Sequence, residues 1–161
     1  MNYSGLNLCD TANGDGVRVS LFVSGCYFHC KGCFNQSAWD FNAGNPFTTE
    51  TIQTISKELS KSYISGLSLL GGDPLCQSNE GLEDLILLCD YTHSIGKTVF
   101  LWSGFTYKWI QEHGTNLQQE LLSKADVFID GQYDESLRDV SLKWRGSSNQ
   151  KIYYPRKTLD K

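Results

Sequence analysis

Segments with the apolar pattern of a β-strand alternate along this chain with segments that have the pattern of an α-helix, and this order constrains the fold more than any other feature. Such alternation predicts right-handed βαβ units and a parallel sheet. The four expected strands cover residues 17–24, 66–70, 98–102 and 126–130. The expected helices run from 49 to about 62, from 79 to just before Gly96, and over parts of 107–124, with an interruption near Gly114. Residues 151–155 are expected to add an edge strand.

The length of the chain limits how many such units it can build. A complete eight-unit barrel takes roughly 250 residues, whereas this chain has 161. One hydrophobic core suits that length, and 40% of the residues are hydrophobic, as expected for a globular domain. We therefore predict an α/β fold of one domain, residues 1–161. It should form an open, curved, partial (βα) barrel with a mostly parallel sheet.

Charge and hydropathy exclude several classes of partner. The formal net charge is −4 and no cluster of lysines and arginines occurs, so a nucleic-acid polymer is not an expected partner. No apolar run approaches the roughly 20 residues that span a bilayer, and the start of the chain lacks the regions of a secretory signal. We expect a cytoplasmic protein with no membrane partner. In that reducing compartment the six cysteines are expected to be ligands, catalytic groups or buried thiols rather than disulfides.

An unusual loop follows each of the four expected strands. These loops cover residues 26–33, 71–74, 103–105 and 131–133. The carboxyl ends of parallel strands meet at one edge of a sheet, where α/β folds collect their reactive groups. We therefore expect the four loops to form one functional face.

The first of these loops carries three cysteines, Cys26, Cys30 and Cys33, at the spacing C-x-x-x-C-x-x-C. Thiolates at this spacing can converge on one soft metal centre, either an iron–sulfur cluster or zinc. Three cysteines would leave one iron of a cubane uncapped, and open coordination positions are where metal sites perform chemistry. The alternative, a binding module stabilised by zinc, lacks the second C-x-x-C pair of many structural sites. His29, inside the loop, is expected to face solvent or a sulfide rather than to act as a ligand.

The other three cysteines stand alone in the sequence. Cys9 is expected to be a surface or edge thiol, and Cys76 a free thiol on the functional face. Cys89 lies on the apolar stripe of an expected helix, where a cysteine packs as a small hydrophobe. We predict that none of these three binds the metal.

The cysteine loop resembles the signature of the radical S-adenosylmethionine superfamily, C-x-x-x-C-x-aromatic-C after the first strand of a partial barrel. It departs from that signature at Gly32, which stands in place of the aromatic residue. With Phe34 and Asn35 behind the last cysteine, the motif is similar to that of the activating proteins of anaerobic ribonucleoside-triphosphate reductases. The likeness continues through NGDGVRVSLFVSGC, LLGGDPL, LWSGF, VFIDGQY and KWRGSSNQ, and so covers nearly the whole chain.

The resemblance implies that the three loop cysteines hold a [4Fe–4S] cluster and that S-adenosylmethionine binds beside it. The backbone at Gly32, Cys33 and Phe34 would lie against the nucleoside. Because Gly32 has no side chain, Phe34 or Tyr27 would supply the adenine contact.

The turn of Gly71, Gly72 and Asp73 resembles the family motif for the methionine ammonium group. Two glycines allow close approach of the main chain, and a carboxylate complements a cation. A plain link between strand and helix would also use glycine and proline. Weaker candidates for the ligand site are Ser103, Lys124 and Asp130, while Trp102, Tyr133 and Trp144 are expected to be core or partner-facing aromatics.

By the same resemblance, the reduced cluster cleaves S-adenosylmethionine to methionine and a 5′-deoxyadenosyl radical. That radical would generate the glycyl radical of the anaerobic ribonucleoside-triphosphate reductase large subunit, with an external electron donor such as flavodoxin. Residues 144–150 are expected to form part of the surface that docks the reductase. The alternatives are an activase of another glycyl radical enzyme, another short radical S-adenosylmethionine enzyme, and the zinc-stabilised module.

Overall fold

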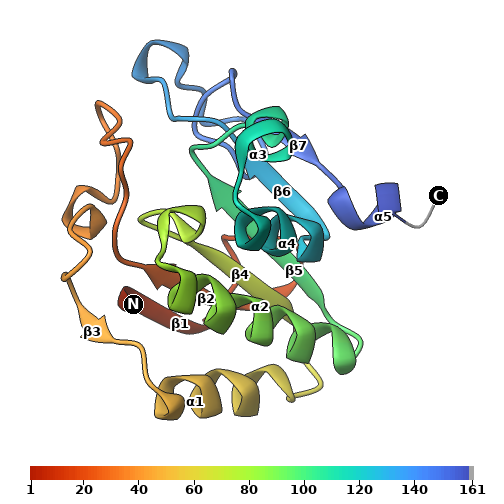
Figure 1. Cartoon of the computed structure of the whole chain (residues 1–161). Coiled ribbons are helices and arrows are strands. Elements are labelled where there is room, and N and C mark those ends of the chain that lie inside the picture. Colours follow the sequence, from red (N-terminus) through yellow and green to blue (C-terminus); the bar gives the residue numbers. More distant parts are fainter. Residues whose placement is uncertain (160–161) are drawn as a thin grey trace.

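A seven-stranded sheet forms the centre of the computed structural model, which describes residues 1–159 and the side chains up to Lys157. The strands lie in the order β3 (Asn45–Pro46), β1 (Asn2–Asp10), β2 (Val17–Val23), β4 (Ile64–Gly71), β5 (Thr98–Ser103), β6 (Val127–Asp130) and β7 (Lys151–Tyr153). The strands β2, β4, β5 and β6 are parallel to one another, whereas β1, β3 and β7 pair antiparallel. The predicted α/β fold with a mostly parallel central sheet is confirmed (Figure 1).

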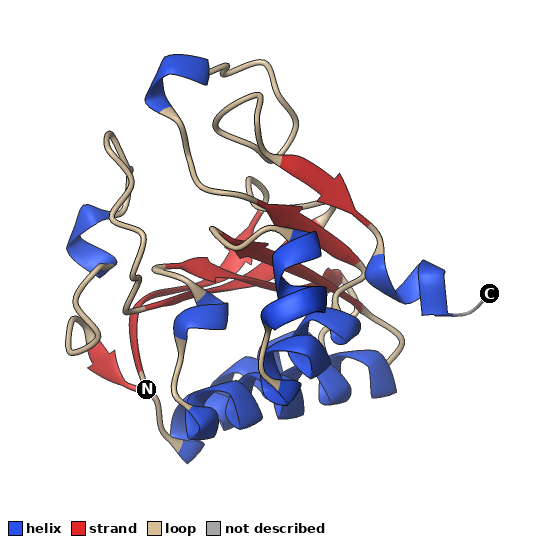
Figure 2. Cartoon of the chain, turned by 45° about the horizontal axis from the view of Figure 1, so that its top comes forward, coloured by secondary structure: helices blue, strands red, loops and turns tan. Residues whose placement is uncertain are grey.

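Helices fill the connections between the parallel strands. They are α1 (Thr49–Leu59), α2 (Asn79–Ser94), α3 (Tyr107–His113) and α4 (Asn116–Lys124), and α5 (Pro155–Leu159) follows β7. Single 3₁₀ turns occur at η1 (Gln36–Ala38), η2 (Pro74–Cys76) and η3 (Glu135–Leu137). Helices α1, α2 and α4 gather on one face of the sheet (Figure 2). The break predicted near Gly114 separates α3 from α4.

Alternation along β2 explains how the sheet faces this helical layer. Val19, Leu21 and Val23 are fully buried in the main hydrophobic core. Side chains alternate between the two faces of a strand, so Arg18 and Ser20 point to the opposite face. The apolar alternation in the sequence therefore predicted both this strand and the face that it buries.

A strand at the start of the chain was not predicted. Strand β1 precedes the strand expected to be first, and it was missed because Ser4 and Gly5 interrupt its apolar pattern. It forms by antiparallel pairing along β2, with Leu6 opposite Leu21. The N-cap of α2 is Ser78, whose hydroxyl accepts a hydrogen bond from the amide of Gly81.

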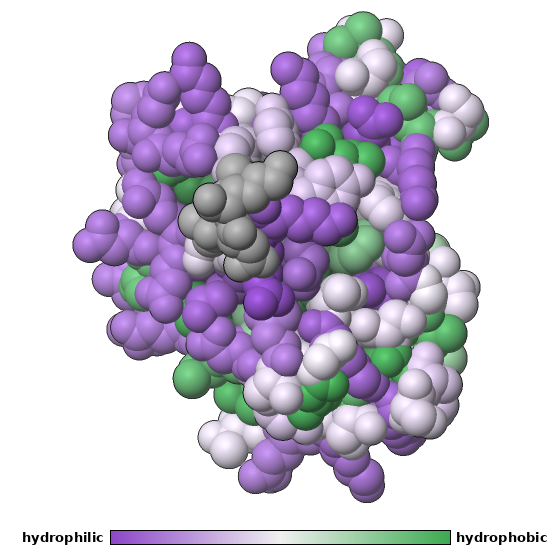
Figure 3. Space-filling view, turned by 90° about the vertical axis from the view of Figure 1, so that its right-hand side faces the viewer, coloured by the Kyte–Doolittle hydropathy of each residue, from purple (hydrophilic) through white to green (hydrophobic). Residues whose placement is uncertain are grey.

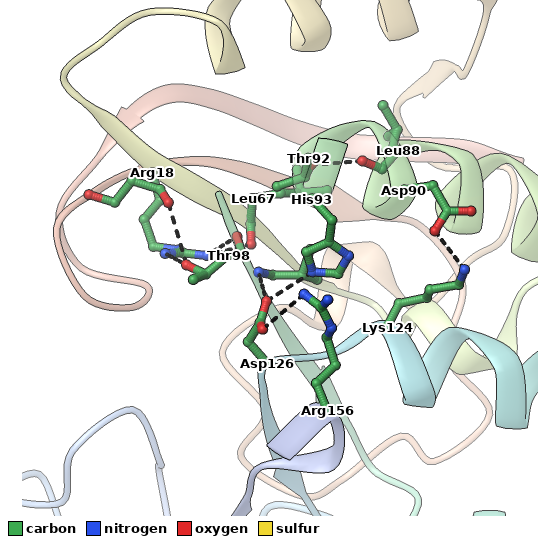
Figure 4. Close-up of polar contacts among 12 residues, drawn as sticks. Arg18, Leu67, Leu88, Asp90, Thr92, His93, Thr98, Lys124, Asp126 and Arg156 are labelled. Atoms are coloured by element: carbon green, nitrogen blue, oxygen red, sulfur yellow. Dashed lines mark hydrogen bonds and ion pairs between the residues drawn. The ribbon is translucent and has the colours of Figure 1, made fainter. Parts of the chain in front are cut away.

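Buried polar networks close the amino ends of the parallel strands, opposite the cysteine loop (Figure 4). The Arg18 guanidinium, 1% exposed, donates to the carbonyls of Leu67 and Thr98 at 2.7 and 2.8 Å. Burial lowers the pKa of Arg18 to about 10. Nearby, Asp126 accepts from His93 at 3.0 Å and from the amide of Val99 at 2.8 Å. These hydrogen bonds connect the amino ends of the parallel strands. The four loops lie at the opposite, carboxyl ends.

The molecular face that carries α5 is mostly hydrophilic, with small separate apolar spots (Figure 3). Of the helices in residues 1–159, none combines the length and the apolar character needed to cross a membrane.

Candidate functional site

A pocket of about 240 Å³ opens at the carboxyl ends of the parallel strands. All four predicted loops contribute to its wall, through Cys26, Gly72, Ser103 and Tyr133 among others. The expectation that one face carries the four loops is therefore confirmed.

The three loop cysteines line this pocket together. All three are free and partly exposed. The loop begins at Gly25, which has a φ of +103° and whose amide donates to the carbonyl of Ala38 at 2.7 Å. A Cβ at Gly25 would lie 2.1 Å from the ring of Phe41, so only glycine can start the loop in this conformation.

Hydrogen bonding and burial shift the pKa values of Cys26, Cys30 and Cys76 in different directions. The Cys76 thiol donates to the sulfur of Cys26, as do the main-chain amides of Phe28 and His29, and together they lower the pKa of Cys26 although burial opposes them. The same contact and burial raise the pKa of Cys76. Burial raises the pKa of Cys30 although the amide of Tyr133 donates to its sulfur. The surroundings of Cys26 therefore favour the thiolate, the metal-binding form, more than those of Cys30 do.

The remaining cysteines lie largely as predicted. Cys9 is exposed and Cys89 is fully buried in the core. Cys76 is a free thiol, 4% exposed, and its contact with Cys26 was not foreseen. His29 is exposed, as expected, and its ring stacks on Trp39 with centroids 4.5 Å apart.

The Gly71-Gly72-Asp73 turn is bonded directly to the start of the cysteine loop. The amide of Gly72 donates to the carbonyl of Val23 at 2.7 Å, and that of Asp73 to the carbonyl of Gly25 at 2.8 Å. A Cβ at Gly72 would lie 2.5 Å from the carbonyl oxygen of Gly25. The glycine is thus required by the approach of the cysteine loop, a reason that the sequence did not reveal.

The carboxylate of Asp73 is buried and satisfied within the chain. It accepts hydrogen bonds from the amides of Leu75 (2.8 Å) and Gly104 (2.7 Å) and from the Ser103 hydroxyl (2.9 and 3.0 Å). Burial raises its pKa to about 7. Ser103, predicted as a weak candidate for a ligand contact, instead holds Asp73. The carboxylate therefore joins the loops after β4 and β5 rather than projecting as a free cation-binding group.

Two other weak candidates lie outside the pocket wall. Asp130 accepts from the amides of Tyr107 (2.8 Å) and Lys151 (3.0 Å). Lys124 pairs with Asp90 at 2.6 Å. Both side chains have structural partners that account for their polarity.

Aromatic side chains form much of the pocket wall. Trp102, Tyr133 and Trp144, expected in the core or at a partner surface, all line it, and so does Trp39. Phe34 also lines the pocket and is 80% exposed. Tyr27 is not part of this wall; it lies against Phe41, with ring centroids 4.9 Å apart.

The structure also explains why position 32 is a glycine. Gly32 has a φ of +75°, which favours glycine. A Cβ there would lie 2.8 Å from the carboxylate of Glu135, which also pairs with Lys31 at 3.5 Å. The space beside position 32 is thus filled from a loop more than a hundred residues further along the chain.

The donor set fits an iron–sulfur cluster. Thiolates are the usual protein ligands of such clusters, and three free thiols line one pocket. Within the described part of the chain, no group of three or more His, Cys, Asp or Glu side chains is arranged to hold a single metal ion. A cubane bonds each cysteine to a different iron and so needs a wider triangle of sulfurs. Three thiols spread around one pocket are compatible with that requirement.

Comparison with known proteins identifies a family of similar chains. A family model described as a 4Fe-4S single cluster domain matches residues 12–153. The anaerobic ribonucleoside-triphosphate reductase-activating protein of Enterobacteria phage T4 is 41% identical over 155 residues, covering 95% of this chain and 94% of the relative. Proteins of the same name from Vibrio cholerae and Escherichia coli K12 are 39% and 37% identical, covering 95% and 97% of this chain and 97% and 100% of theirs. The range matched by the family model contains all four loops of the pocket.

Proposed function

Since this chain belongs to the family of the anaerobic ribonucleoside-triphosphate reductase-activating proteins, we propose that it activates such a reductase by cleaving S-adenosylmethionine at a [4Fe–4S] cluster on Cys26, Cys30 and Cys33. One observation carries this assignment. The three free thiols line the same pocket as the Gly71-Gly72-Asp73 turn, so a metal centre and the methionine end of a ligand can meet there.

Held by the three cysteines, a [4Fe–4S] cluster would supply one electron to the sulfonium of S-adenosylmethionine, with methionine as the leaving group and a 5′-deoxyadenosyl radical that would take a hydrogen atom from a glycine of the reductase large subunit. This chain's own residues provide the setting. The three cysteines hold the metal, and the main chain of Gly71 and Gly72 offers the methionine group a surface without side chains. Trp39, Trp102 and Tyr133 give the cavity aromatic walls, which would exclude water once the open side of the pocket is covered.

Asp73 acts in this scheme as a positioning residue. Its hydrogen bonds to Ser103 and Gly104 fix the turn after β4 to the loop after β5. Its own amide fixes the same turn to Gly25, next to the first cysteine. Through its side chain and its main-chain amide together, this one residue therefore links three of the four loops. Ligand recognition by the turn then falls to its main-chain groups.

The surroundings of the pocket support a protein substrate. The sheet is open, with β3 and β7 as its two edges, and we assign it as the partial (βα) barrel of a single radical S-adenosylmethionine domain. A pocket open to solvent cannot by itself hold a carbon radical away from water. A glycine-bearing segment of the reductase would close it, because glycine allows the closest main-chain approach. The electron would come from an external donor such as flavodoxin, in the cytoplasm.

Electron paramagnetic resonance tests this function directly. The anaerobically reconstituted, reduced protein is mixed with S-adenosylmethionine and the reductase, whose glycines are isotopically labelled. A label-dependent glycyl doublet is expected only in the complete mixture. Metal analysis of the same preparation is expected to give iron with matching sulfide. Stoichiometric zinc, or efficient turnover of a small molecule without the reductase, would exclude the proposal.

A further inference from the structure

Three polar side chains of the segment Gly146–Gln150 make hydrogen bonds to the loop that follows β6. It lies within residues 144–150, whose role in docking the reductase stays a prediction; Ser147 is fully buried, whereas Ser148 and Asn149 are exposed. The segment contains no helix or strand; main-chain hydrogen bonds tie it to residues 137–139, and its side chains make further hydrogen bonds. Those bonds are concentrated on one neighbouring stretch of main chain, residues 131–134.

Three side chains grip consecutive peptide groups of that stretch. The Gln150 amide donates to the carbonyl of Gly131 at 2.9 Å, and the Asn149 amide donates to the carbonyl of Gln132 at 2.8 Å. The Ser147 hydroxyl accepts from the amide of Asp134 at 3.1 Å. Gln150 also stabilises the gripping segment itself, since its carbonyl oxygen accepts from the amide of Gly146 at 2.9 Å.

The gripped loop meets the cysteine loop on its other side. Between Gln132 and Asp134, the ring of Tyr133 lines the pocket, and its main-chain amide donates to the sulfur of Cys30. The Tyr133 ring lies 6.5 Å from that of Phe34, and it rests against Gly146, where a Cβ would lie 3.0 Å from it.

Beyond Tyr133, the contact between the two loops continues. Glu135 fills the space beside Gly32 and pairs with Lys31. Arg138 lies over the ring of Phe34 at 5.7 Å. The 131–138 loop thus contributes Gly131 and Tyr133 to the pocket wall and contacts the cysteine loop beside it.

We propose that Ser147, Asn149 and Gln150 are positioning residues that hold residues 131–134 against the cysteine loop and thereby set the wall of the S-adenosylmethionine pocket formed by Tyr133. This inference rests on the proposed function for the identity of the ligand. The grip itself is a property of the chain and can be measured without catalysis.

The variant Gln150→Glu removes one bond of the grip and keeps the bond that folds the segment; because Gln150 also lines the pocket, Asn149→Ala, at a residue outside the pocket wall, shows whether the effect passes through residues 131–134. Glutamate keeps the oxygen that accepts from Gly146 but has no amide to donate to Gly131. Asn149→Ala removes only the bond to Gln132. The matched control is Gln119→Glu, because the Gln119 amide also donates to main-chain carbonyls, those of Gln111 and Gly114, at 3.3 and 3.1 Å, on the α3–α4 connection.

The experiment uses the full chain with its cluster reconstituted anaerobically. Hydrogen–deuterium exchange is expected to quicken at residues 131–135 and 30–34 in Gln150→Glu and Asn149→Ala, with iron content unchanged. Titration with S-adenosylmethionine, followed by the resonance of the reduced cluster, is expected to show affinity about tenfold weaker per hydrogen bond lost. Gln119→Glu should change neither quantity.

The two proposals fail in different ways. Faster exchange confined to 146–150, with ligand affinity unchanged, would overturn the positioning role. If the unsubstituted protein itself does not respond to S-adenosylmethionine, the proposed function falls, and the spread of exchange into 131–135 still decides whether the grip exists.

Discussion

Replacing Asp73 by asparagine tests whether this side chain orders the pocket or binds the ligand directly. The substitution preserves size and removes the charge. In the structure, Oδ1 accepts from the amide of Leu75 and Oδ2 from the amide of Gly104, while the Ser103 hydroxyl reaches both oxygens. Asparagine can serve only one of the two amides, because its NH₂ group is a donor.

The expected magnitude follows from the group that loses its partner. With the carbonyl oxygen of the new side chain at Leu75, its NH₂ group faces the N–H of Gly104, and one buried donor is left unpaired. Such a loss costs about 1–3 kcal/mol. For a chain of this length, each kcal/mol lowers the unfolding midpoint by about 2–4 °C. Affinity for S-adenosylmethionine should fall together with stability, since the same bonds order the turn.

The assay combines thermal unfolding with ligand titration of the reconstituted protein. Asp139→Asn is the matched control, because that carboxylate also accepts from an amide and a hydroxyl, both of Ser141 (2.9 and 2.6 Å), but at a solvated loop. The control should leave the unfolding midpoint and the affinity unchanged. An Asp73→Asn protein that keeps its stability while losing more than tenfold in affinity would refute the reasoning and make the carboxylate a direct ligand contact.

Three further outcomes are expected. Alanine at any one of the three loop cysteines should abolish the cluster, measured as iron content and visible absorbance, whereas Cys9→Ala, which changes an exposed thiol, should keep it; retention of iron without one of the three would contradict the ligand assignment. Gly72→Val should lose iron as well as ligand affinity, because its side chain meets the carbonyl of Gly25 at the root of the cysteine loop; normal iron with weakened affinity would instead point to a clash with the ligand alone. Asp126 has a pKa below its ordinary 3.8, because hydrogen bonds from His93 and the Val99 amide outweigh the effect of burial. Its contribution to stability is therefore present above about pH 4 and is lost as the pH falls through the lowered pKa. Asp126→Asn should reduce the dependence of the free energy of unfolding on pH in this range, and an unchanged dependence would refute the role of Asp126.

Much of the fold was predictable because each helix or strand is indicated by the pattern of apolar residues within its own segment of the sequence. The strand at 17–24 and the helices after it show apolar residues at periods that only one kind of element satisfies. Strand β1 escaped because its formation depends on the exposed edge of β2 rather than on its own pattern. The one-domain organisation and the ligand roles of the cysteines stay predictions.

The sequence by itself determined the chemistry available to this protein. Three cysteines at close spacing behind a strand, with glycine-rich turns after the next strands, brought thiols and open main chain to one edge of a parallel sheet. This follows from chain connectivity alone, because every parallel strand delivers its following loop to the same edge.

Only the tertiary structure decided which side chains hold those loops in place. The Asp73 carboxylate accepts a hydrogen bond from Ser103, thirty residues away, and Glu135 fills the space beside Gly32. The segment expected to dock a partner grips residues 131–134. A buried polar group must find a partner among whatever the fold brings within about 3 Å. That set of neighbours comes from loops far apart in the chain, and no local pattern in the sequence records it.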